Sequence, residues 1–308
     1  MPSYVRILIV GLGRWGARQL DAFLATARCE VVAVVDQQPD RAASVRGIPG
    51  FTSIEHALAT VPVDAAVVVT PEVTHAPIAI SLLERGLDVF VEKPLALSLS
   101  AATAVATAAR TRGRVCMVGG PLEHHPGVRL IQQLAAGNAI GTVRRIESTR
   151  LATRRTTDDP WWLLAPHDLS LLLALAGRPL ALATRPRHDG SVRARVSLPN
   201  HVCGTIRVGF GQPQKVRHLV VTGDNGTLEL DDTAPLGRCV TVRRTGSPPE
   251  QPFVQQTAPL AAQAAAFVAA VAQGRPPERG GYPQAVEVIR WLEAGFGSPS
   301  AWATPIQS

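Results

Sequence analysis

Short apolar runs alternate with longer helical segments over the first 120 residues of the chain. The runs are nearly continuous, which is the pattern of strands buried on both faces of a parallel sheet. Strands that alternate with helices of this length predict crossover connections and a doubly wound α/β fold. The predicted strands lie at residues 5–10, 30–35, 64–70, 87–91 and 114–118, and the predicted helices at 17–27, 77–85 and 98–111.

The pattern changes after residue 120, where most of the apolar runs are strand-like and follow one another closely. Asp224-Asn225-Gly226 lies between two of these runs and indicates a hairpin. We therefore predict a domain with a parallel sheet over residues 1–120 and an α+β domain with a mixed or antiparallel sheet over 121–308. Its last helices are candidates to pack back on the first domain. Helices are predicted at 125–136, 161–176, 260–273 and 282–294, and strands at 142–152, 180–187, 192–198, 202–210, 216–222, 227–230 and 239–244.

A glycine-rich sequence follows the first predicted strand and precedes the first predicted helix. It contains Gly11, Gly13 and Gly16, with Arg14 and Trp15 before the last glycine. In a dinucleotide-binding motif these glycines make the tight turn, let a pyrophosphate approach the backbone, and let helix and strand pack closely. Glycines also mark ordinary turns. The place of this motif between strand and helix predicts a Rossmann domain, with the diphosphate on the N–H groups at the helix start.

Asp36 ends the second predicted strand, about 20 residues after the last glycine of the motif, where a carboxylate accepts hydrogen bonds from the adenosine ribose. The alternative is a turn residue that opens the next helix. The same carboxylate would repel a 2′-phosphate, which favours NAD over NADP. Arg41 and Arg46 follow closely enough in the sequence to leave NADP open.

Lys93 is one of only two lysines in a chain with 29 arginines, the other being Lys215. A lysine with a shifted pKa exchanges a proton near neutral pH, whereas an arginine stays charged. Lys93 follows the predicted strand at 87–91, and ligands of doubly wound sheets bind outside the carboxyl ends of the strands. Lys93 is therefore a candidate catalytic cation. The alternative is a surface lysine in a turn.

His167 lies in an otherwise apolar segment and follows Pro166, a residue that can begin a helix at its first turn. We therefore expect His167 near a helix N-terminus, where an imidazole can hold or release a proton near neutral pH. The alternative is that His167 or Asp168 only caps this helix.

The net charge of +7 first suggests a nucleic-acid partner. The arginines are spread along the chain, however, and lack both a known motif and interleaved aromatic residues, so we expect no nucleic acid. A basic surface would still attract phosphorylated substrates or cofactors. No apolar stretch is long enough to cross a bilayer and the start has no signal-peptide layout, so we expect a cytoplasmic protein without a membrane partner.

The four cysteines are scattered without CxxC pairing, which predicts neither a metal site nor a disulfide framework. We expect them to be small buried hydrophobic residues. They are Cys29, Cys116, Cys203 and Cys239.

Together these motifs resemble the glucose-fructose oxidoreductase and inositol dehydrogenase family (Gfo/Idh/MocA) over essentially the whole chain. The resemblance implies a two-domain oxidoreductase that moves a hydride between nicotinamide C4 and a carbinol or carbonyl carbon of a sugar, nucleotide sugar or cyclitol. It further implies a biosynthetic pathway, a small-molecule substrate and a homodimer or homotetramer. The residues that carry it are the glycine motif, Asp36, Thr70-Pro71 with His75, Gly86 through Glu92-Lys93-Pro94, His167-Asp168-Leu169, and Gly223 through Leu228.

The same resemblance implies that Lys93 hydrogen-bonds the reacting oxygen and that His167 exchanges its proton, and it leaves open which of the two is the general base. A cation near a developing alkoxide stabilises the transition state. The implied cofactor-binding residues are Gly11, Gly13, Arg14, Trp15, Gly16, Asp36, Thr70, Pro71, His75, Glu92, Lys93 and Pro94, and the implied substrate residues are His125, Trp162 and Asp168.

The chain departs from the family pattern at two positions. Many members have an aspartate four residues before the catalytic histidine, where this chain has Leu163, and similar members have a histidine where this chain has Gly120. Two alternatives follow from these lost polar groups. One is a reductase of an imine or a non-sugar carbonyl, favoured by an apolar pocket. The other is a catalytically impaired protein that binds a dinucleotide for sensing.

Overall fold

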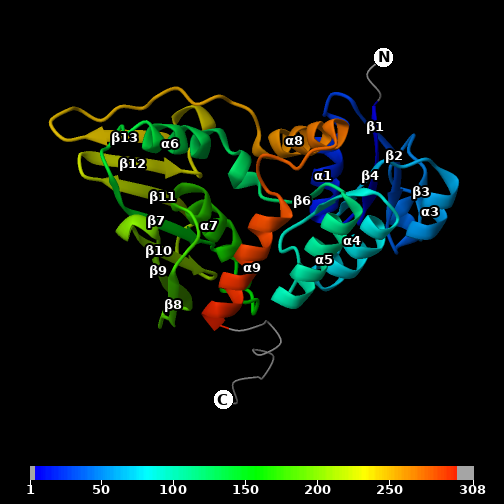
Figure 1. The fold of residues 1–308 in the computed structure, drawn as a ribbon, viewed down its shortest axis with the longest axis horizontal. Helices are drawn as coiled ribbons and strands as arrows, with labels where there is room; N and C mark the ends of the chain where they lie inside the picture. Colours follow the sequence, from blue (N-terminus) through cyan, green and yellow to red (C-terminus); the bar gives the residue numbers. More distant parts are fainter. Residues whose placement is uncertain (1–3, 297–308) are drawn as a thin grey trace. The chain divides into compact units, whose positions relative to one another are not determined.

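The computed structural model describes residues 4–296, which form two compact units (Figure 1). The first unit joins residues 4–121 with 258–289, and the second joins 122–257 with 290–296. The chain therefore leaves the first unit and returns to it at α8 (Pro259–Gln273), and α9 (Tyr282–Phe296) begins in the first unit and ends in the second. Residues 297–308 of the predicted second domain lie outside the described residues.

A six-stranded parallel sheet in the order β3-β2-β1-β4-β5-β6 forms the centre of the first unit. This is the doubly wound order whose direction reverses between β1 and β4, the place where dinucleotides bind. The predicted fold of this half is confirmed. The strands are β1 (Val5–Val10), β2 (Cys29–Val35), β3 (Gly50–Phe51), β4 (Ala65–Val68), β5 (Asp88–Val91) and β6 (Cys116–Val118).

The helices of this unit differ from the prediction at two places. First, α1 begins inside the glycine motif, three residues before the apolar periodicity that predicted it. Second, the sequence between β2 and β4 holds two short helices and β3, none of which was predicted, because these elements are only 2 to 7 residues long. The helices are α1 (Arg14–Leu24), α2 (Pro39–Ala42), α3 (Ile54–Thr60), α4 (His75–Glu84) and α5 (Leu99–Arg112), with a 3₁₀ turn at Glu72–Thr74.

Three aromatic rings from distant parts of the sequence meet in the core of the first unit. Phe23 of α1, Phe90 of β5 and Phe267 of α8 pack edge to face, with ring centroids between 5.7 and 6.1 Å apart. This geometry is the favoured one for aromatic pairs. The returning helix α8 thus contributes to the same core as α1, and the two helices lie side by side (Figure 1).

A seven-stranded mixed sheet in the order β13-β12-β11-β7-β10-β9-β8 forms the second unit. Only β7 and β10 pair in parallel, and the other neighbours are antiparallel. The predicted mixed sheet and the hairpin at Asp224-Asn225 are confirmed. The strands are β7 (Val143–Leu151), β8 (Ala181–Pro186), β9 (Ser191–Ser197), β10 (Cys203–Gly209), β11 (Val216–Gly223), β12 (Gly226–Asp231) and β13 (Val240–Arg244).

Two helices, α6 (Pro126–Ala136) and α7 (Pro160–Ala176), pack against this sheet, α6 on β12 and α7 on β10 and β7. Short 3₁₀ turns occur at Pro121–His124, Pro199–His201 and Leu236–Arg238. The strand residues alternate between the buried and the exposed face. This alternation places Cys203 of β10 on the exposed face, so the expectation that all four cysteines are buried is wrong.

Among residues 4–296, no helix is both long and apolar enough to cross a membrane.

Candidate active site

The glycine motif brings three stretches of backbone very close together. Gly11 has a φ of +97°, and a Cβ atom there would lie 2.6 Å from the carbonyl oxygen of Val69. A Cβ on Gly16 would lie 2.0 Å from the Gly11 oxygen, whereas a Cβ on Gly13 would have no atom within 4 Å. Gly11 and Gly16 therefore serve the packing of β1, β4 and α1. Gly13 instead faces open space at the N-terminus of α1, where N–H groups and the helix dipole favour an anion.

Asp36 fastens the glycine loop to the end of β2. Its Oδ2 accepts a hydrogen bond from the Leu12 N–H at 2.8 Å, and its Oδ1 accepts one from the Gln38 N–H at 2.9 Å. The contact with Gln38 is the one expected if Asp36 is a turn residue. The contact with Leu12 goes beyond a turn, because it binds the glycine loop. Each carboxylate oxygen keeps a further lone pair that can accept from a ribose hydroxyl.

His75 connects the loop after β4 with the segment after β5. Its Nδ1 lies 2.7 Å from the carbonyl oxygen of Pro94, and its Nε2 lies 2.8 Å from that of Thr70. The ring is 1% exposed, so its role is to hold these two loops together. Thr70 also accepts a hydrogen bond from the Thr74 hydroxyl at 2.7 Å, and Pro71 is exposed beside it.

Glu92 precedes Lys93 and is held from two sides. Its Oε1 accepts from Nε2 of Gln19 at 2.5 Å, and its Oε2 accepts from the Lys93 N–H at 3.1 Å. A Cβ on Gly119 would lie 3.0 Å from this carboxyl group, so a larger residue there would displace it. Burial raises the pKa of Glu92, and the Gln19 amide and the charge of Lys93 offset part of this rise. The Lys93–Pro94 peptide bond is cis.

These features fit a dinucleotide. The first unit offers an open position over Gly13, a fastened carboxylate at Asp36 and two connected loops at the carboxyl ends of β4 and β5. Arg14 and Trp15 are exposed in the first turn of α1, and the guanidinium carbon of Arg18 lies 4.9 Å from the centre of the Trp15 ring. The sequence motif predicted these positions, whereas Gln19 was missed because its contact with Glu92 spans 73 residues.

The structure corrects the expected location of His167. α7 begins at Pro160, where Asp159 caps the helix by accepting from the Trp161 N–H at 2.8 Å, and Pro166 lies inside the helix. His167 is therefore in the helix interior and neither His167 nor Asp168 is the cap. His167 is the only residue from 165 to 172 that is not buried. Leu163, which is also partly exposed, precedes it by one helical turn and shares its face.

Asp168, the residue after His167, lies on the buried side of α7 and has a structural role. Its side chain is fully buried and accepts from the Ser148 hydroxyl at 2.5 Å and from Nε of Arg150 at 3.2 Å. Both partners belong to β7, so Asp168 joins the helix to the sheet. In this structure Asp168 contacts Arg150 and Ser148, and any influence of Asp168 on a ligand would pass through these two residues.

The other two predicted substrate residues are also buried. His125 caps α6, its Nδ1 accepting from the Gly127 N–H at 3.1 Å, and its Nε2 lies 3.5 Å from Oδ1 of Asp232. Burial lowers the pKa of His125, and Asp232 opposes this shift. Trp162 is 3% exposed. Arg150, Ser148 and Asp232 were missed, although the strand alternation at 142–152 places residues 148 and 150 on the same face.

Comparison with known proteins gives the context of these two sites. Residues 5–120 match the family described as "Oxidoreductase family, NAD-binding Rossmann fold". The chain is 31% identical to the 4-carboxy-2-hydroxymuconate-6-semialdehyde dehydrogenase of Sphingobium sp. over 188 residues, which cover 56% of this chain and 60% of that protein. It is also 31% identical to the UDP-N-acetylglucosamine 3-dehydrogenase of Acidithiobacillus ferrooxidans over 180 residues, 56% of this chain and 55% of that protein.

The matching stretches thus cover little more than half of these two relatives. A solved structure of the A. ferrooxidans dehydrogenase covers 94% of this chain and 95% of its own, with a TM-score of 0.84 and 24% identity. This likeness extends the shared fold to both units.

Proposed function

Because the chain belongs to the Gfo/Idh/MocA oxidoreductase family, we propose that it catalyses hydride transfer between NAD(P) and a carbinol or carbonyl carbon of a small molecule. The observation that carries this proposal is the place of Lys93. It follows β5 at the carboxyl edge of a doubly wound sheet, in a segment that His75 ties to the loop after β4. Ligands of such sheets bind at this edge.

The residues of the first unit would hold the cofactor. The diphosphate would lie over Gly13 at the start of α1, and Asp36 would accept from the adenosine ribose. The fastened carboxylate of Asp36 supports NAD as the preferred cofactor, with NADP as the alternative, because a 2′-phosphate would meet a negative charge there. When bound, the nicotinamide would supply or accept the hydride.

Lys93 and His167 would handle the proton of the reacting hydroxyl or carbonyl group. A lysine ammonium at the reacting oxygen would stabilise negative charge as it develops. The partly exposed His167 would hold or release the proton, since an imidazole titrates near neutral pH. Between residues 165 and 172 of α7, His167 is the only one that is not buried. This exposure supports the proposed role.

We propose a sugar, nucleotide sugar or cyclitol as the substrate class, acted on in a biosynthetic pathway. The support is the name of the A. ferrooxidans relative, which acts on a nucleotide sugar. Leu163 supports a second candidate, the reduction of an imine or a non-sugar carbonyl, because it puts an apolar side chain one turn before His167. A dinucleotide-binding protein without catalysis is the third possibility.

Replacement of Lys93 tests the proposed function. We expect Lys93→Ala to lower kcat/KM by about a thousandfold or more while the dissociation constant for NAD changes little, since the lysine acts on the transition state. Turnover would be followed by the absorbance of the reduced cofactor with scyllo-inositol, D-glucose, UDP-N-acetylglucosamine and cyclic imines, and NAD binding by calorimetry. Lys215→Ala is the matched control, because Lys215 is the other lysine and is exposed.

Three outcomes would be decisive. Full activity of Lys93→Ala would overturn the role of this lysine. Turnover of cyclic imines with no turnover of any sugar or cyclitol would favour the second candidate. Tight NAD binding without turnover of any compound would favour the binding protein.

We also propose a cytoplasmic homodimer or homotetramer. Support for assembly comes from the exposed face of the seven-stranded sheet, which carries Arg193 and Arg195 on β9 and Glu147 and Glu229 on β7 and β12. Two copies could bring Arg193 or Arg195 of one sheet close to Glu147 of the other, whereas Glu229 is already paired with Arg243 at 2.9 Å. Light scattering at low and high salt tests this, because a monomer at low salt would contradict it.

A further inference from the structure

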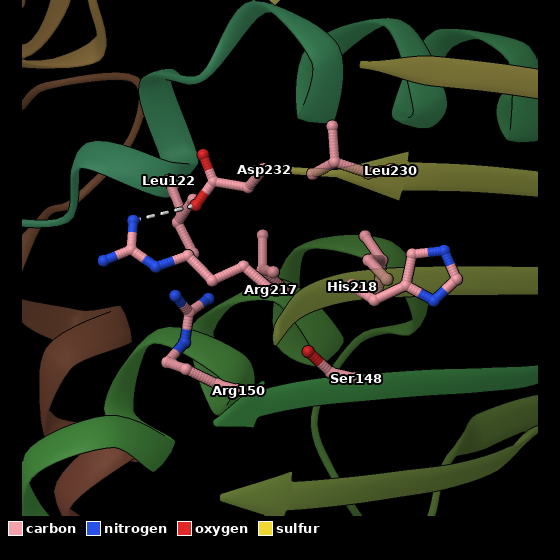
Figure 2. A pocket seen from close by; sticks show the side chains of 9 residues that line it. Leu122, Ser148, Arg150, Arg217, His218, Leu230 and Asp232 are labelled. Carbon is pink, nitrogen blue, oxygen red and sulfur yellow. Dashed lines mark hydrogen bonds and ion pairs between the residues drawn. The ribbon is translucent and has the colours of Figure 1, made fainter. Parts of the chain in front are cut away.

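A small pocket in the second unit is lined by charged side chains that the sequence did not single out (Figure 2). Arg150 reaches it from β7 and Arg217 from β11, and Asp232 lies just after β12. The pocket therefore spans three neighbouring strands of the sheet. Its apolar lining consists of Leu122, Leu171, Leu219 and Leu230.

Arg150 and Arg217 are direct partners across the β7–β11 ladder. Residues paired in this way have their side chains on the same face of the sheet, where two like charges repel each other. Figure 2 shows both guanidinium groups at the same end of the pocket. Negative charge close to both arginines offsets this repulsion.

Protein carboxylates supply one negative charge for each arginine. Asp168 accepts from Nε and Nη2 of Arg150 at 3.2 and 3.4 Å, and Asp232 accepts from Nη1 of Arg217 at 3.3 Å. A guanidinium group has five N–H donors. Within residues 4–296, Nη1 of Arg150 and both Nε and Nη2 of Arg217 have no acceptor.

The degree of burial differs between the two pairs. The Arg150 side chain is 10% exposed and its partner Asp168 is fully buried, so this pair is part of the packing between α7 and the sheet. The Arg217 side chain is 42% exposed and can reorient. The donors of Arg217 that Asp232 does not use can therefore face water or an added acceptor. The unused N–H groups of Arg150 and Arg217 thus lie next to each other, beside the leucine side chains of the pocket.

The open volume of the pocket is about 10 Å³, which is room for one water molecule. We propose that the pocket widens when the exposed Arg217 side chain moves and then binds an oxyanion, either a carboxylate or a phosphate group, of the substrate. Arg150 provides a fixed donor and Arg217 a movable one, and guanidinium groups suit oxyanions because their N–H groups are arranged in a fork. This inference rests on the proposed function in its reference to a substrate. Arg150 and Arg217 are then specificity-determining residues that favour anionic over neutral substrates.

The pocket is also connected to the proposed catalytic helix. Asp168, which holds Arg150, directly follows His167 in α7. An anion bound by Arg150 is therefore linked, through one ion pair, to the residue next to the proposed proton carrier.

Calorimetric titration of the full chain in the presence of NAD tests the pocket. The probes are D-glucose as the neutral reference, D-glucuronate for a carboxylate and D-glucose 6-phosphate for a phosphate ester, with inorganic phosphate to detect binding of the free ion. We expect at least one anionic sugar to bind about tenfold or more tightly than D-glucose, and Arg217→Gln to remove that difference. The sugar with the larger preference identifies the anion.

Arg144→Gln is the matched control. Arg144 is also a β7 arginine paired with an aspartate, Asp224, but its side chain is 56% exposed at the hairpin end of the strand. We expect this variant to keep the anionic preference. Equal binding of neutral and anionic sugars by the unaltered protein, including no binding of any, would overturn the proposal. Retention of the full preference by Arg217→Gln would overturn it as well.

The titration separates this inference from the proposed function because it does not depend on turnover. An anionic preference without hydride transfer to or from any compound would refute the proposed function and leave the anion site. Turnover of sugars without an anionic preference would refute the anion site alone.

Discussion

Each unit holds a carboxylate away from solvent, Glu92 partly and Asp168 fully, and the two do so in different ways. In the first unit, Glu92 accepts from the neutral amide of Gln19 and from a backbone N–H, and burial raises its pKa. In the second unit, Asp168 accepts from the Ser148 hydroxyl and from the guanidinium of Arg150. If Glu92 loses its charge, neither of its two donors is left as an unpaired cation. If Asp168 loses its charge, Arg150 loses its counter-ion.

This difference extends to the two candidate sites. The cofactor site of the first unit is formed mainly by backbone, because glycines permit the close approach of β1, β4 and α1. The pocket of the second unit is formed by charged side chains in a particular strand register. Substitutions of similar size should therefore act through steric overlap in the first unit and through unpaired charge in the second.

The largest expected effect is that of Asp168→Asn. The amide cannot neutralise Arg150, and an uncompensated buried charge costs about 3 kcal/mol or more. Glu92→Gln is the matched substitution in the first unit. Oε1 of Gln19 is buried without a partner, so a rotation of the Gln19 amide lets it accept from the new amide. We expect a loss of about 1 kcal/mol or less for this variant.

Urea unfolding at neutral pH would measure both variants of this pair. A loss for Glu92→Gln that equals the loss for Asp168→Asn would contradict the comparison, because it would mean that Glu92 also balances a buried cation.

The second prediction separates two glycines of the same motif. Gly16→Ala should lower the free energy of unfolding by about 3 kcal/mol, since its Cβ would lie 2.0 Å from the backbone oxygen of Gly11 and neither main chain can move freely. Gly13→Ala should fold almost normally, because no atom lies within 4 Å of its Cβ. We expect it to raise the dissociation constant for NAD about tenfold or more, as the methyl group occupies the place of the diphosphate.

Thermal unfolding and NAD titration of both glycine variants are the measurements. Unchanged NAD affinity in Gly13→Ala would contradict the proposed position of the diphosphate. Unchanged stability of Gly16→Ala would contradict the steric account of the first unit.

The sequence predicts the first unit well because its evidence is local. Each signal can be recognised within a short stretch of sequence. This holds for the glycine motif, for Asp36 and for the apolar runs. Prediction failed where the elements are too short to show a periodicity, as for β3 and α3 between residues 50 and 60.

In the second unit the elements are predictable but their contacts are not. The start of α7 was misplaced because Pro166 resembles a helix-initiating proline, although Asp159 supplies the cap. The Arg150–Asp168 pair depends on how α7 packs against β7, and the Arg150–Arg217 pair on the register of two strands. Local sequence contains neither piece of information, so the charged pocket could only be found in the structure.

The smallest expected effect is a pH dependence that differs in sign between the two units. Burial raises the pKa of Glu92 above its ordinary value of 4.5, so the folded protein holds this proton more tightly than the unfolded chain does. The contribution of Glu92 to stability is therefore fully present below pH 4.5 and is lost as the pH rises through the raised pKa. Glu92→Gln does not titrate, so we expect it to gain stability relative to the unaltered protein as the pH increases.

Asp189→Asn in the second unit is the control for this titration. The hydroxyl and N–H of Ser191 and the guanidinium of Arg207 lower the pKa of Asp189 to about 2, so its contribution is present above pH 3.8 and is lost only as the pH falls toward that value. Urea midpoints measured between about pH 4 and about pH 8 should therefore show a constant difference between this variant and the unaltered protein. The difference for Glu92→Gln should change over the same range. A constant difference for Glu92→Gln as well would mean that Glu92 is already ionised in the folded protein at the acidic end of this range, which would remove the contrast between the two carboxylates.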